Sequence, residues 1–309
     1  MKALFSWLSA AFGFAMFLVA VFVIRRELHG HTVGEIFAAA SAVPGYRLVL
    51  AFAFTILCYL VLTGYDLLAT RALHPRPRTG SIMLNSFICH ALSLNVGCSS
   101  LMGGSIRCHY YLRKGVKMPD IIRIVTFCFV TFWLGFLALG GTIFLVAPPP
   151  IPTFIRLPFA TLQPVGALFL VALAVYFLLI LIRKEPIKIR GWVIPAIPAH
   201  ITIVQILLSV SEWLLGAAVL YALFPHHGTG MYFHLLSFYF LAQVSGLVSQ
   251  VPSGLGVFES ILLAFAPAGA DPTRILGSIL LYRLIFNLLP LTIAGMLLLV
   301  REVRYRRMT

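Results

Sequence analysis

The chain has 309 residues, of which 61% are hydrophobic and only 10% are charged. Soluble domains usually carry about 25% charged residues, so this composition argues against a soluble globular protein. A net charge of +14 would suggest nucleic-acid binding in a soluble protein, but here the basic residues flank apolar runs, as the positive-inside rule for membrane proteins describes. We therefore expect an integral membrane protein with no nucleic-acid partner.

Six apolar runs are long enough to cross a hydrocarbon core about 30 Å thick. In chain order they are Leu4–Ile24, Leu48–Thr70, Ile121–Ala147, Pro164–Ile182, His200–Phe224 and Thr273–Val300. The first is too long for a signal-peptide core and lacks a small-residue cleavage site, so we interpret it as a retained span. Between the first two runs, Val33–Ala42 predicts a short helix in the membrane interface.

Two further apolar segments are interrupted by small and polar residues. Ser81–Val116 contains a stretch rich in Ser and Gly from Ser93 to Ser105, and Met231–Pro267 contains the run Gln250–Glu259 with Pro252 and two glycines. Neither interruption suits a lipid-facing helix, because broken backbone inside a membrane must be satisfied by protein or water.

The charges predict how these segments are threaded. Seventeen of the 23 Lys and Arg residues fall in regions that we assign to the cytoplasm, namely Lys2, 71–78, 107–123, 183–190 and 301–309. The opposite side receives five, and Arg283 stays inside a span. Each interrupted segment then begins and ends on one side, which predicts a re-entrant hairpin. The alternative is two kinked full spans, giving eight crossings.

The predicted fold is therefore an all-α, polytopic protein of a bacterial inner membrane, with six spans, two hairpins and both termini in the cytoplasm. Residues 1–309 form a single membrane domain that divides into half-repeats 1–155 and 156–309. Each half has three crossings, so the second half is inverted relative to the first. Paired interrupted segments in inverted halves are typical of a transporter binding site.

Half-helices that begin inside the membrane offer free N–H groups and a positive dipole end to an anion. We expect the second arm of each hairpin to begin at its break, and glycines there would let a phosphate head group approach the backbone. The candidate residues for head-group binding are Gly103, Gly104 and Ser105 in the first hairpin, and Pro252, Ser253, Gly254, Leu255 and Gly256 in the second.

Charged residues inside the membrane are functional candidates, because an unpaired charge there is unfavourable. Arg107 and Arg283 are candidate phosphate ligands, and the alternative for Arg283 is a structural pair with Glu259, Glu212 or Asp66. Glu259 and Glu212 would then relay protons or balance the arginines. For Asp66, near the end of its span, we expect a structural role. A distance below about 12 Å is predicted between Arg283 and Glu259.

Signatures of metal or covalent chemistry are missing from the sequence. The five cysteines form no Cys-x-x-Cys pair, and no His-Glu-x-x-His motif, Gly-x-Ser-x-Gly elbow or P-loop occurs. We therefore predict no metal, no cofactor and no catalytic residue.

Three motifs carry a family resemblance: Gly103-Gly104-Ser-Ile-Arg107, Pro252-Ser-Gly-Leu-Gly-Val-Phe-Glu259, and Leu281-Tyr-Arg283 followed by Leu289-Pro290. In this order they resemble the membrane domain of lysylphosphatidylglycerol synthase/flippase (MprF), and in length the chain is more similar to the stand-alone YbhN-type inner membrane proteins. The resemblance covers roughly residues 45–300. The chain departs from it at Cys108-His109-Tyr110, where the family usually has Tyr-Arg-Leu.

This resemblance implies a phospholipid flippase that binds an anionic head group between the hairpins. The family's aminoacyl-transfer module follows its membrane part, whereas this chain ends nine residues after its last predicted span, so we do not expect it to synthesise aminoacyl lipid. The alternatives are a membrane-embedded enzyme acting on lipid head groups through Glu259 or Glu212, and a non-catalytic partner in an envelope lipid pathway. A homo-oligomer is left open.

Overall fold

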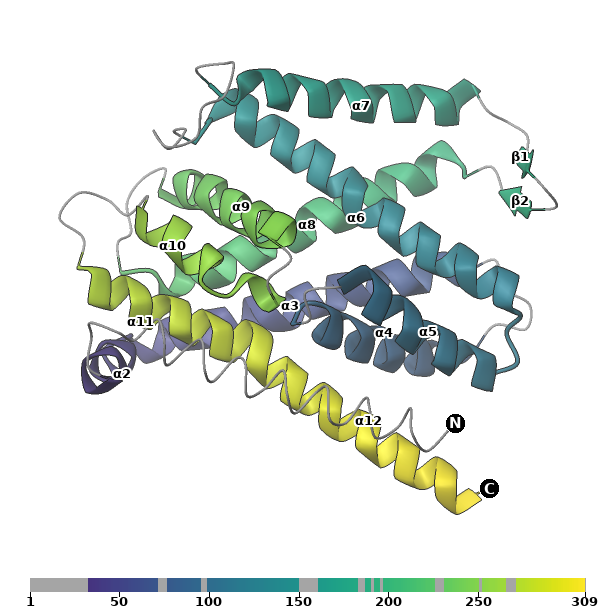
Figure 1. The fold of residues 1–309 in the computed structure, drawn as a ribbon, viewed down its shortest axis with the longest axis horizontal. Coiled ribbons are helices and arrows are strands. Elements are labelled where there is room, and N and C mark those ends of the chain that lie inside the picture. The colour runs from purple at the N-terminus through teal and green to yellow at the C-terminus, as the bar shows by residue number, and fades with distance from the viewer. Residues whose placement is uncertain are drawn as a thin grey trace.

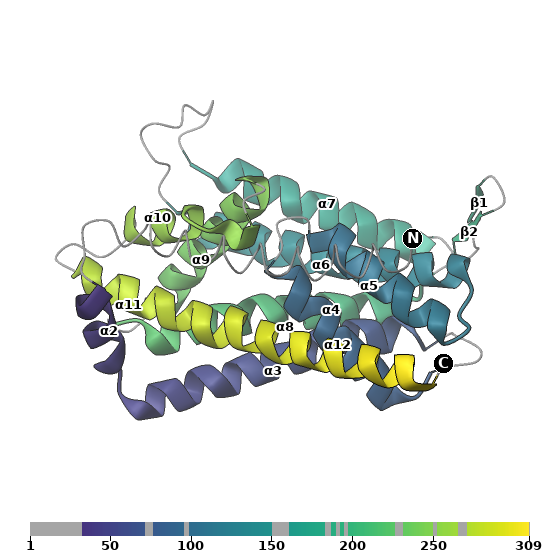
Figure 2. The ribbon, with the colours of Figure 1, turned by 60° about the horizontal axis from the view of Figure 1, so that its bottom comes forward.

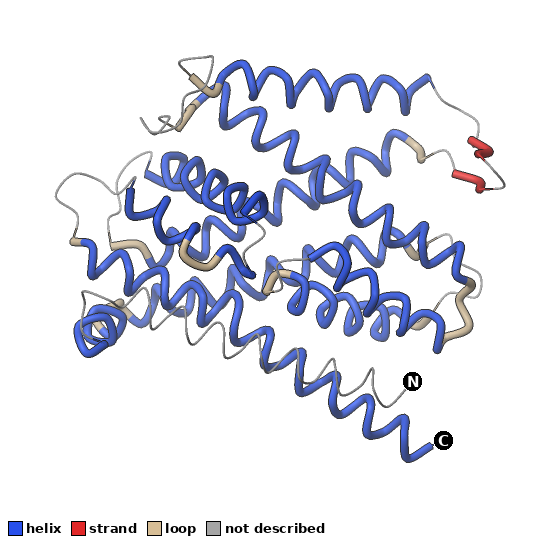
Figure 3. The backbone as a smooth tube through the Cα atoms, viewed as in Figure 1, coloured by secondary structure: helices blue, strands red, loops and turns tan. Residues whose placement is uncertain are grey.

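The computed structural model describes residues 33–71, 77–95, 99–149, 161–182, 187–189, 192–194, 197–225, 231–249, 252–264 and 271–308. Almost all of them are helical (Figures 1 and 3). The expected all-α fold is confirmed, and the strands among the described residues are a small antiparallel pair, β1 (Ile187–Ile189) and β2 (Trp192–Ile194). It forms in a predicted loop whose isoleucine and valine residues favour strands. The predicted first span, Leu4–Ile24, lies outside the described residues.

Five of the described helices are long and apolar enough to cross a membrane. They are α3 (Gly45–Ala69), α6 (Met118–Val146), α7 (Gln163–Ile182), α8 (Ala199–Leu223) and the continuous segment Pro272–Arg301. That segment contains α11 (Pro272–Tyr282), a π-helical section (Arg283–Leu288) and the beginning of α12 (Leu289–Met308). Each span lies within three residues of its prediction at both ends, which confirms a polytopic helical membrane protein.

Both interrupted segments fold as helix pairs. The first becomes α4 (Thr79–Ser93) and α5 (Ser99–Arg113), which pack against each other. Fifteen residues of helix extend about 22 Å, less than a hydrocarbon core of about 30 Å. The second becomes α9 (Met231–Ser249), a turn of 3₁₀ helix (Pro252–Gly254) and α10 (Val257–Ala264), which packs on α9. Paired arms support hairpins rather than two kinked full spans.

The two hairpins face each other in the middle of the molecule. The α4–α5 pair opens toward the end where α12 finishes, whereas the α9–α10 pair opens toward the end that holds α2 (Val33–Ser41) and α11 (Figures 1 and 2). Behind the hairpins in the view of Figure 1, α3 and α8 pack along each other, and α7 lies on the outside against α6. The short helix predicted near residues 33–42 is α2, which packs on α11.

The crossing of α6 and α8 depends on Gly135. A Cβ atom at this position would lie 2.8 Å from the carbonyl carbon of Ser209 and closer still to its side chain. Backbone atoms cannot rotate away as a side chain can, so any larger residue must push the two helices apart.

We therefore expect Gly135→Ala to destabilise the protein by about 1–3 kcal/mol, which is the usual effect of overpacking. Gly295→Ala is the matched control, because a Cβ there meets nothing within 4 Å. On helix α12 it should be neutral or stabilising by up to about 1 kcal/mol, since alanine has the higher helix propensity. Thermal unfolding in detergent, followed by tryptophan fluorescence, measures both. Equal midpoints for the two variants would contradict the close crossing.

The orientation remains a prediction from the charge bias. In a cysteine-free background, a single cysteine at position 227 should react with a membrane-impermeant maleimide from outside, and one at position 188 from the cytoplasmic side only. Labelling of position 227 from the cytoplasm alone would overturn the assigned topology.

Candidate functional site

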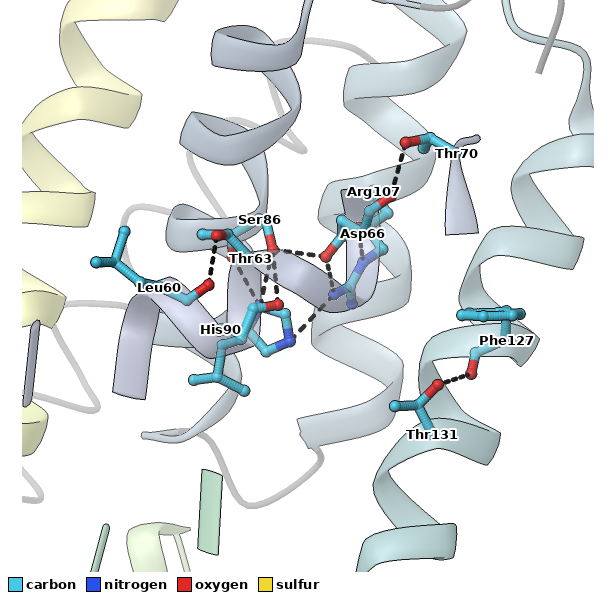
Figure 4. Close-up of polar contacts among 10 residues, drawn as sticks. Leu60, Thr63, Asp66, Thr70, Ser86, His90, Arg107, Phe127 and Thr131 are labelled. Carbon is cyan, nitrogen blue, oxygen red and sulfur yellow. Dashed lines mark hydrogen bonds and ion pairs between the residues drawn. The ribbon is translucent and has the colours of Figure 1, made fainter. Parts of the chain in front are cut away.

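A buried ion pair joins the first hairpin to α3. Arg107 on α5 donates from Nε to Oδ1 of Asp66 at 2.8 Å and from Nη2 to Oδ2 at 2.7 Å. The two residues are 7% and 0% exposed (Figure 4). A fork of two parallel hydrogen bonds is the strong geometry for arginine and carboxylate. The pair therefore fixes the second arm of the hairpin against the end of α3.

Two residues of α4 complete this cluster. Ser86 donates its hydroxyl proton to Oδ2 of Asp66 at 2.6 Å. His90 Nδ1 lies 2.9 Å from the carbonyl oxygen of Ser86, and its Nε2 lies 3.3 Å from Nη2 of Arg107. Because arginine only donates and a carbonyl only accepts, His90 carries its proton on Nδ1 and accepts at Nε2. The histidine is neutral, and the cluster as a whole has no net charge (Figure 4).

The sequence offered Asp66 as a partner for Arg283, and that pairing is wrong. Asp66 is held by Arg107 and Ser86, so its contacts fit the structural role expected for it. Arg107 likewise directs two of its nitrogen atoms to Asp66. A phosphate would therefore have to share this arginine with Asp66 and His90.

The second hairpin also forms a buried ion pair, but here the hairpin supplies the carboxylate and the long helix supplies the arginine. Nε of Arg283, in the π-helical section, donates to Oε1 of Glu259 on α10, which confirms the predicted proximity. Oε2 of Glu259 accepts the backbone N–H of Gly256 at 2.8 Å. A glutamate at the third position of a helix that reaches back to the capping residue is half of a capping box. Glu259 therefore satisfies the helix start as well as the arginine.

The tip of this hairpin has an unusual backbone. Ser253, Gly254 and Gly256 have φ values of 55°, 61° and 83°. Glycine adopts this left-handed region freely, whereas serine is strained there by about 1 kcal/mol or more. The surrounding contacts hold Ser253 in place, because Nη1 of Arg283 donates to its carbonyl oxygen at 3.2 Å and to its Oγ at 3.1 Å.

Next to this tip are two polar atoms with unused bonding capacity. Nη2 of Arg283 and Oδ1 of Asn287 find no hydrogen-bond partner among the residues that the structure describes. The two side chains belong to residues that are only 6% and 9% exposed. Both side chains bond Ser253 through another atom. Buried polar atoms are nearly always paired, so an open donor and an open acceptor on two side chains that meet at Ser253 mark a place for a polar ligand.

The π-helical section connects both hairpin tips. Pro290 has no N–H to offer to the carbonyl oxygen of Phe286 one turn earlier, and Tyr59 of α3 donates to that oxygen instead, at 3.2 Å. The backbone N–H of Leu289 reaches the carbonyl of Leu284, five residues back, as in a π-bulge.

Asn287 lies within this bulge and contacts both hairpins. Its backbone carbonyl oxygen accepts a hydrogen bond from Nδ2 of Asn95 at 3.3 Å. Asn95 lies just after α4, the first arm of the first hairpin. Nδ2 of Asn287 donates to Oγ of Ser253 in the second hairpin at 3.3 Å. Pro290 is the visible signal for this bulge in the sequence, but no sequence motif pointed to Asn287, Asn95, Ser86 or His90.

The glycines of the first hairpin have a different role from the expected one. Helix α5 begins at Ser99, so Gly103, Gly104 and Ser105 lie inside the helix and not at its N-terminus. A Cβ on Gly103 would come within 2.6 Å of Oγ of Ser93 on α4. This glycine therefore lets the two arms approach each other. Packing between the arms has overridden the helix-breaking tendency that the sequence suggested.

Glu212 pairs with neither arginine. It lies in the middle of α8 and accepts a hydrogen bond from the hydroxyl of Tyr65 on α3. The structure thus separates the three candidate carboxylates into two ion-paired groups and one with a neutral partner. Among the described residues, no group of three His, Cys, Asp or Glu side chains is placed to hold a metal ion.

Together the fold and its two pairs define a polytopic helical membrane protein with two facing hairpins. No family model matches the chain. It is 35% identical over 287 residues to Uncharacterized protein slr0712 of Synechocystis sp., covering 93% of this chain and 89% of that protein. It is 26% identical over 313 residues to Inner membrane protein YbhN of Escherichia coli, covering 99% and 94%.

A third relative is Phosphatidylglycerol lysyltransferase of Staphylococcus aureus, 27% identical over 300 residues. The match takes 94% of this chain but only 34% of that protein, in its membrane region. The chain belongs to the YbhN-like family of multi-pass bacterial inner membrane proteins, which is related to the membrane region of MprF.

The first ion pair leads to a stability prediction. Asp66→Asn should destabilise the protein by about 3–5 kcal/mol, because it leaves Arg107 as an uncompensated buried charge. The double variant Asp66→Asn with Arg107→Gln should recover part of this loss, since it buries no charge. Unfolding of Asp66→Asn, Arg107→Gln and the double variant in detergent gives the coupling energy. Additive effects of the two substitutions would contradict a direct pair.

Proposed function

We propose that this protein moves phospholipid between the leaflets of the inner membrane, and that it binds the lipid phosphate at the tip of the second hairpin. One observation carries the proposal: the open donor of Arg283 and the open acceptor of Asn287 lie beside Ser253, where the second hairpin turns. The acyl chains of the lipid would stay in the bilayer while its head group enters the protein.

The chemistry of these atoms suits a phosphodiester head group. Nη2 of Arg283 donates, and hydrogen bonds from arginine to phosphate are among the strongest available to a protein. Oδ1 of Asn287 accepts, so it would take a hydroxyl or ammonium group of the same head group. Gly254 and Gly256 allow close approach to the backbone at this tip. Asn95 brings the first hairpin to the same place.

The share of the first hairpin in the site is smaller than the sequence suggested. Arg107 is committed to Asp66, and Gly103 is packed against Ser93. We propose that this hairpin contributes its tip near Asn95 and acts as the opposite wall. Inverted halves that open toward opposite ends would let a rocking motion expose the site to each leaflet in turn.

The relatives support a lipid substrate. The name of the lysyltransferase refers to phosphatidylglycerol, and this chain matches its membrane region. We therefore propose an anionic phospholipid of this class as the substrate. A head-group enzyme that uses Glu259 as its acid or base is disfavoured, because both oxygens of that carboxylate are already engaged.

The test replaces Arg283 by lysine, which keeps a positive charge for Glu259 but removes the open guanidinium donor. Loss of one hydrogen bond to a charged group should slow lipid exchange about 10- to 100-fold. Ser253→Ala should have a smaller effect, because it leaves Nη2 of Arg283 in place. Thr292→Ala is the control, because the Thr292 hydroxyl donates to the carbonyl oxygen of Leu288 one turn earlier and lies away from the hairpin tips in the hydrogen bonds of the described residues.

The measurement is dithionite quenching of fluorescent phosphatidylglycerol in liposomes that contain each variant, together with the phospholipid that copurifies in mild detergent. Unfolding midpoints verify that the variants are folded. A folded Arg283→Lys variant with unimpaired exchange would rule out this site and leave the arginine a structural role only.

A further inference from the structure

Glu212 is the one candidate carboxylate that belongs to neither of the two buried ion pairs. Its side chain accepts from the Tyr65 hydroxyl, and no Lys, Arg or His lies within ion-pair distance of it in the described part of the chain. It is the fourteenth of 25 residues in α8, which places it near the middle of a membrane span. An ionised carboxylate there is unfavourable without a counter-charge, whereas a protonated one is tolerated.

The groups around Glu212 are neutral. The titratable side chains that face it are Cys58, Tyr59 and Tyr65 from α3 and Tyr239 from α9. Helices α6, α7 and α11, which also pack on α8, bring no ion-pairing group to it within the described ranges. The charge state of Glu212 is therefore not fixed by any neighbouring cation.

A stripe of polar side chains leads along α8 to this carboxylate. Thr202, Gln205, Ser209 and Glu212 are spaced by three, four and three residues, so they share one face of the helix. The first three residues are fully buried. Gln205 donates to Oγ1 of Thr131 on α6 at 2.7 Å. Ser209 donates to the carbonyl of Phe132 at 3.2 Å, and its side chain lies beside the Tyr65 hydroxyl.

Part of this stripe has unused bonding capacity. Oγ1 of Thr202 and Oε1 of Gln205 are buried and find no partner among the described residues. A membrane helix that only packed against its neighbours would be expected to avoid such atoms, because an unsatisfied polar group is unfavourable there. Unpartnered polar atoms along one face would suit water molecules that pass a proton from one group to the next.

We propose that Glu212 is a proton-binding site, that protons reach it along this stripe from the Ala199 end of α8, and that its protonation is coupled to lipid movement. The coupling rests on the proposed function; the proton site does not. In the ionised state the carboxylate accepts from Tyr65. An incoming proton adds to a carboxylate oxygen, and the neutral acid then holds Tyr65 less strongly. No other reactant is required.

Tyr65 connects the proposed proton site to the first hairpin. It is 2% exposed, and the next residue along α3 is Asp66, which holds the first hairpin through Arg107. Glu212 and Tyr65 also lie at the contact between α3 and α8, the helices that join the two proposed halves. Protonation therefore weakens a contact at the place where the halves would have to shift.

The proton site is tested by infrared difference spectroscopy of purified protein between about pH 5 and about pH 9, a window that spans the raised titration range of buried carboxyls. The wild type should show a titrating band of a protonated carboxyl group that disappears in Glu212→Gln and stays in Asp120→Asn, whose side chain is 32% exposed. Gln205→Leu should keep the band and slow its appearance after a pH jump. A band that is absent, or that persists in Glu212→Gln, overturns the proton site.

The coupling is tested in liposomes of phosphatidylcholine containing fluorescent phosphatidylglycerol, with and without a pH gradient. The gradient should change wild-type exchange about tenfold, which corresponds to about 1.4 kcal/mol of coupling, and should leave Glu212→Gln unaffected. An equal response of both proteins overturns the coupling. Wild-type protein that shows the infrared band but no lipid exchange refutes the proposed lipid function, and the coupling with it, while the proton site stands.

Discussion

Charged side chains inside a bilayer need partners, and two buried arginine–carboxylate pairs meet this requirement at the hairpins. Arg107 of α5 holds Asp66 of α3, and Glu259 of α10 holds Arg283 of the last span. Each pair joins the second arm of a hairpin to a long helix. Separating either pair would leave a lone buried charge, so each hairpin is expected to move together with its helix rather than open independently.

The last span couples these two units because its helix is irregular. Pro290 removes one backbone donor, and the helix before it widens into a π-helical section. The carbonyl oxygen of Phe286, which Pro290 cannot bond, accepts a hydrogen bond from Tyr59 of α3 instead. Asn287 then contacts Asn95 of one hairpin and Ser253 of the other. A regular helix would keep its carbonyl groups for its own ladder, so the irregularity is what lets one residue connect both tips.

The sequence predicted those features that the bilayer itself dictates. Span lengths follow from hydropathy, the hairpins follow from charge bias, and the pairing of Arg283 with Glu259 follows from the unfavourable energy of an isolated charge. It did not predict that α5 begins at Ser99, because that start depends on how closely Gly103 packs against the other arm. The pairing of Asp66 with Arg107, 41 residues apart, depends in the same way on the assembled fold.

The ion pair at the second hairpin also limits how a lipid can be recognised there. Glu259 already balances the charge of Arg283, so the tip as a whole offers no net positive charge to a phosphate. Attraction at long range is therefore weak, and recognition falls to short-range, directional hydrogen bonds such as the one that Nη2 of Arg283 can still donate. A site of this kind can release its ligand as readily as it takes it up, because no strong Coulomb attraction has to be overcome when the head group leaves for either leaflet. If the protein moves lipid as proposed, a neutralised arginine is therefore better suited to this site than a free one.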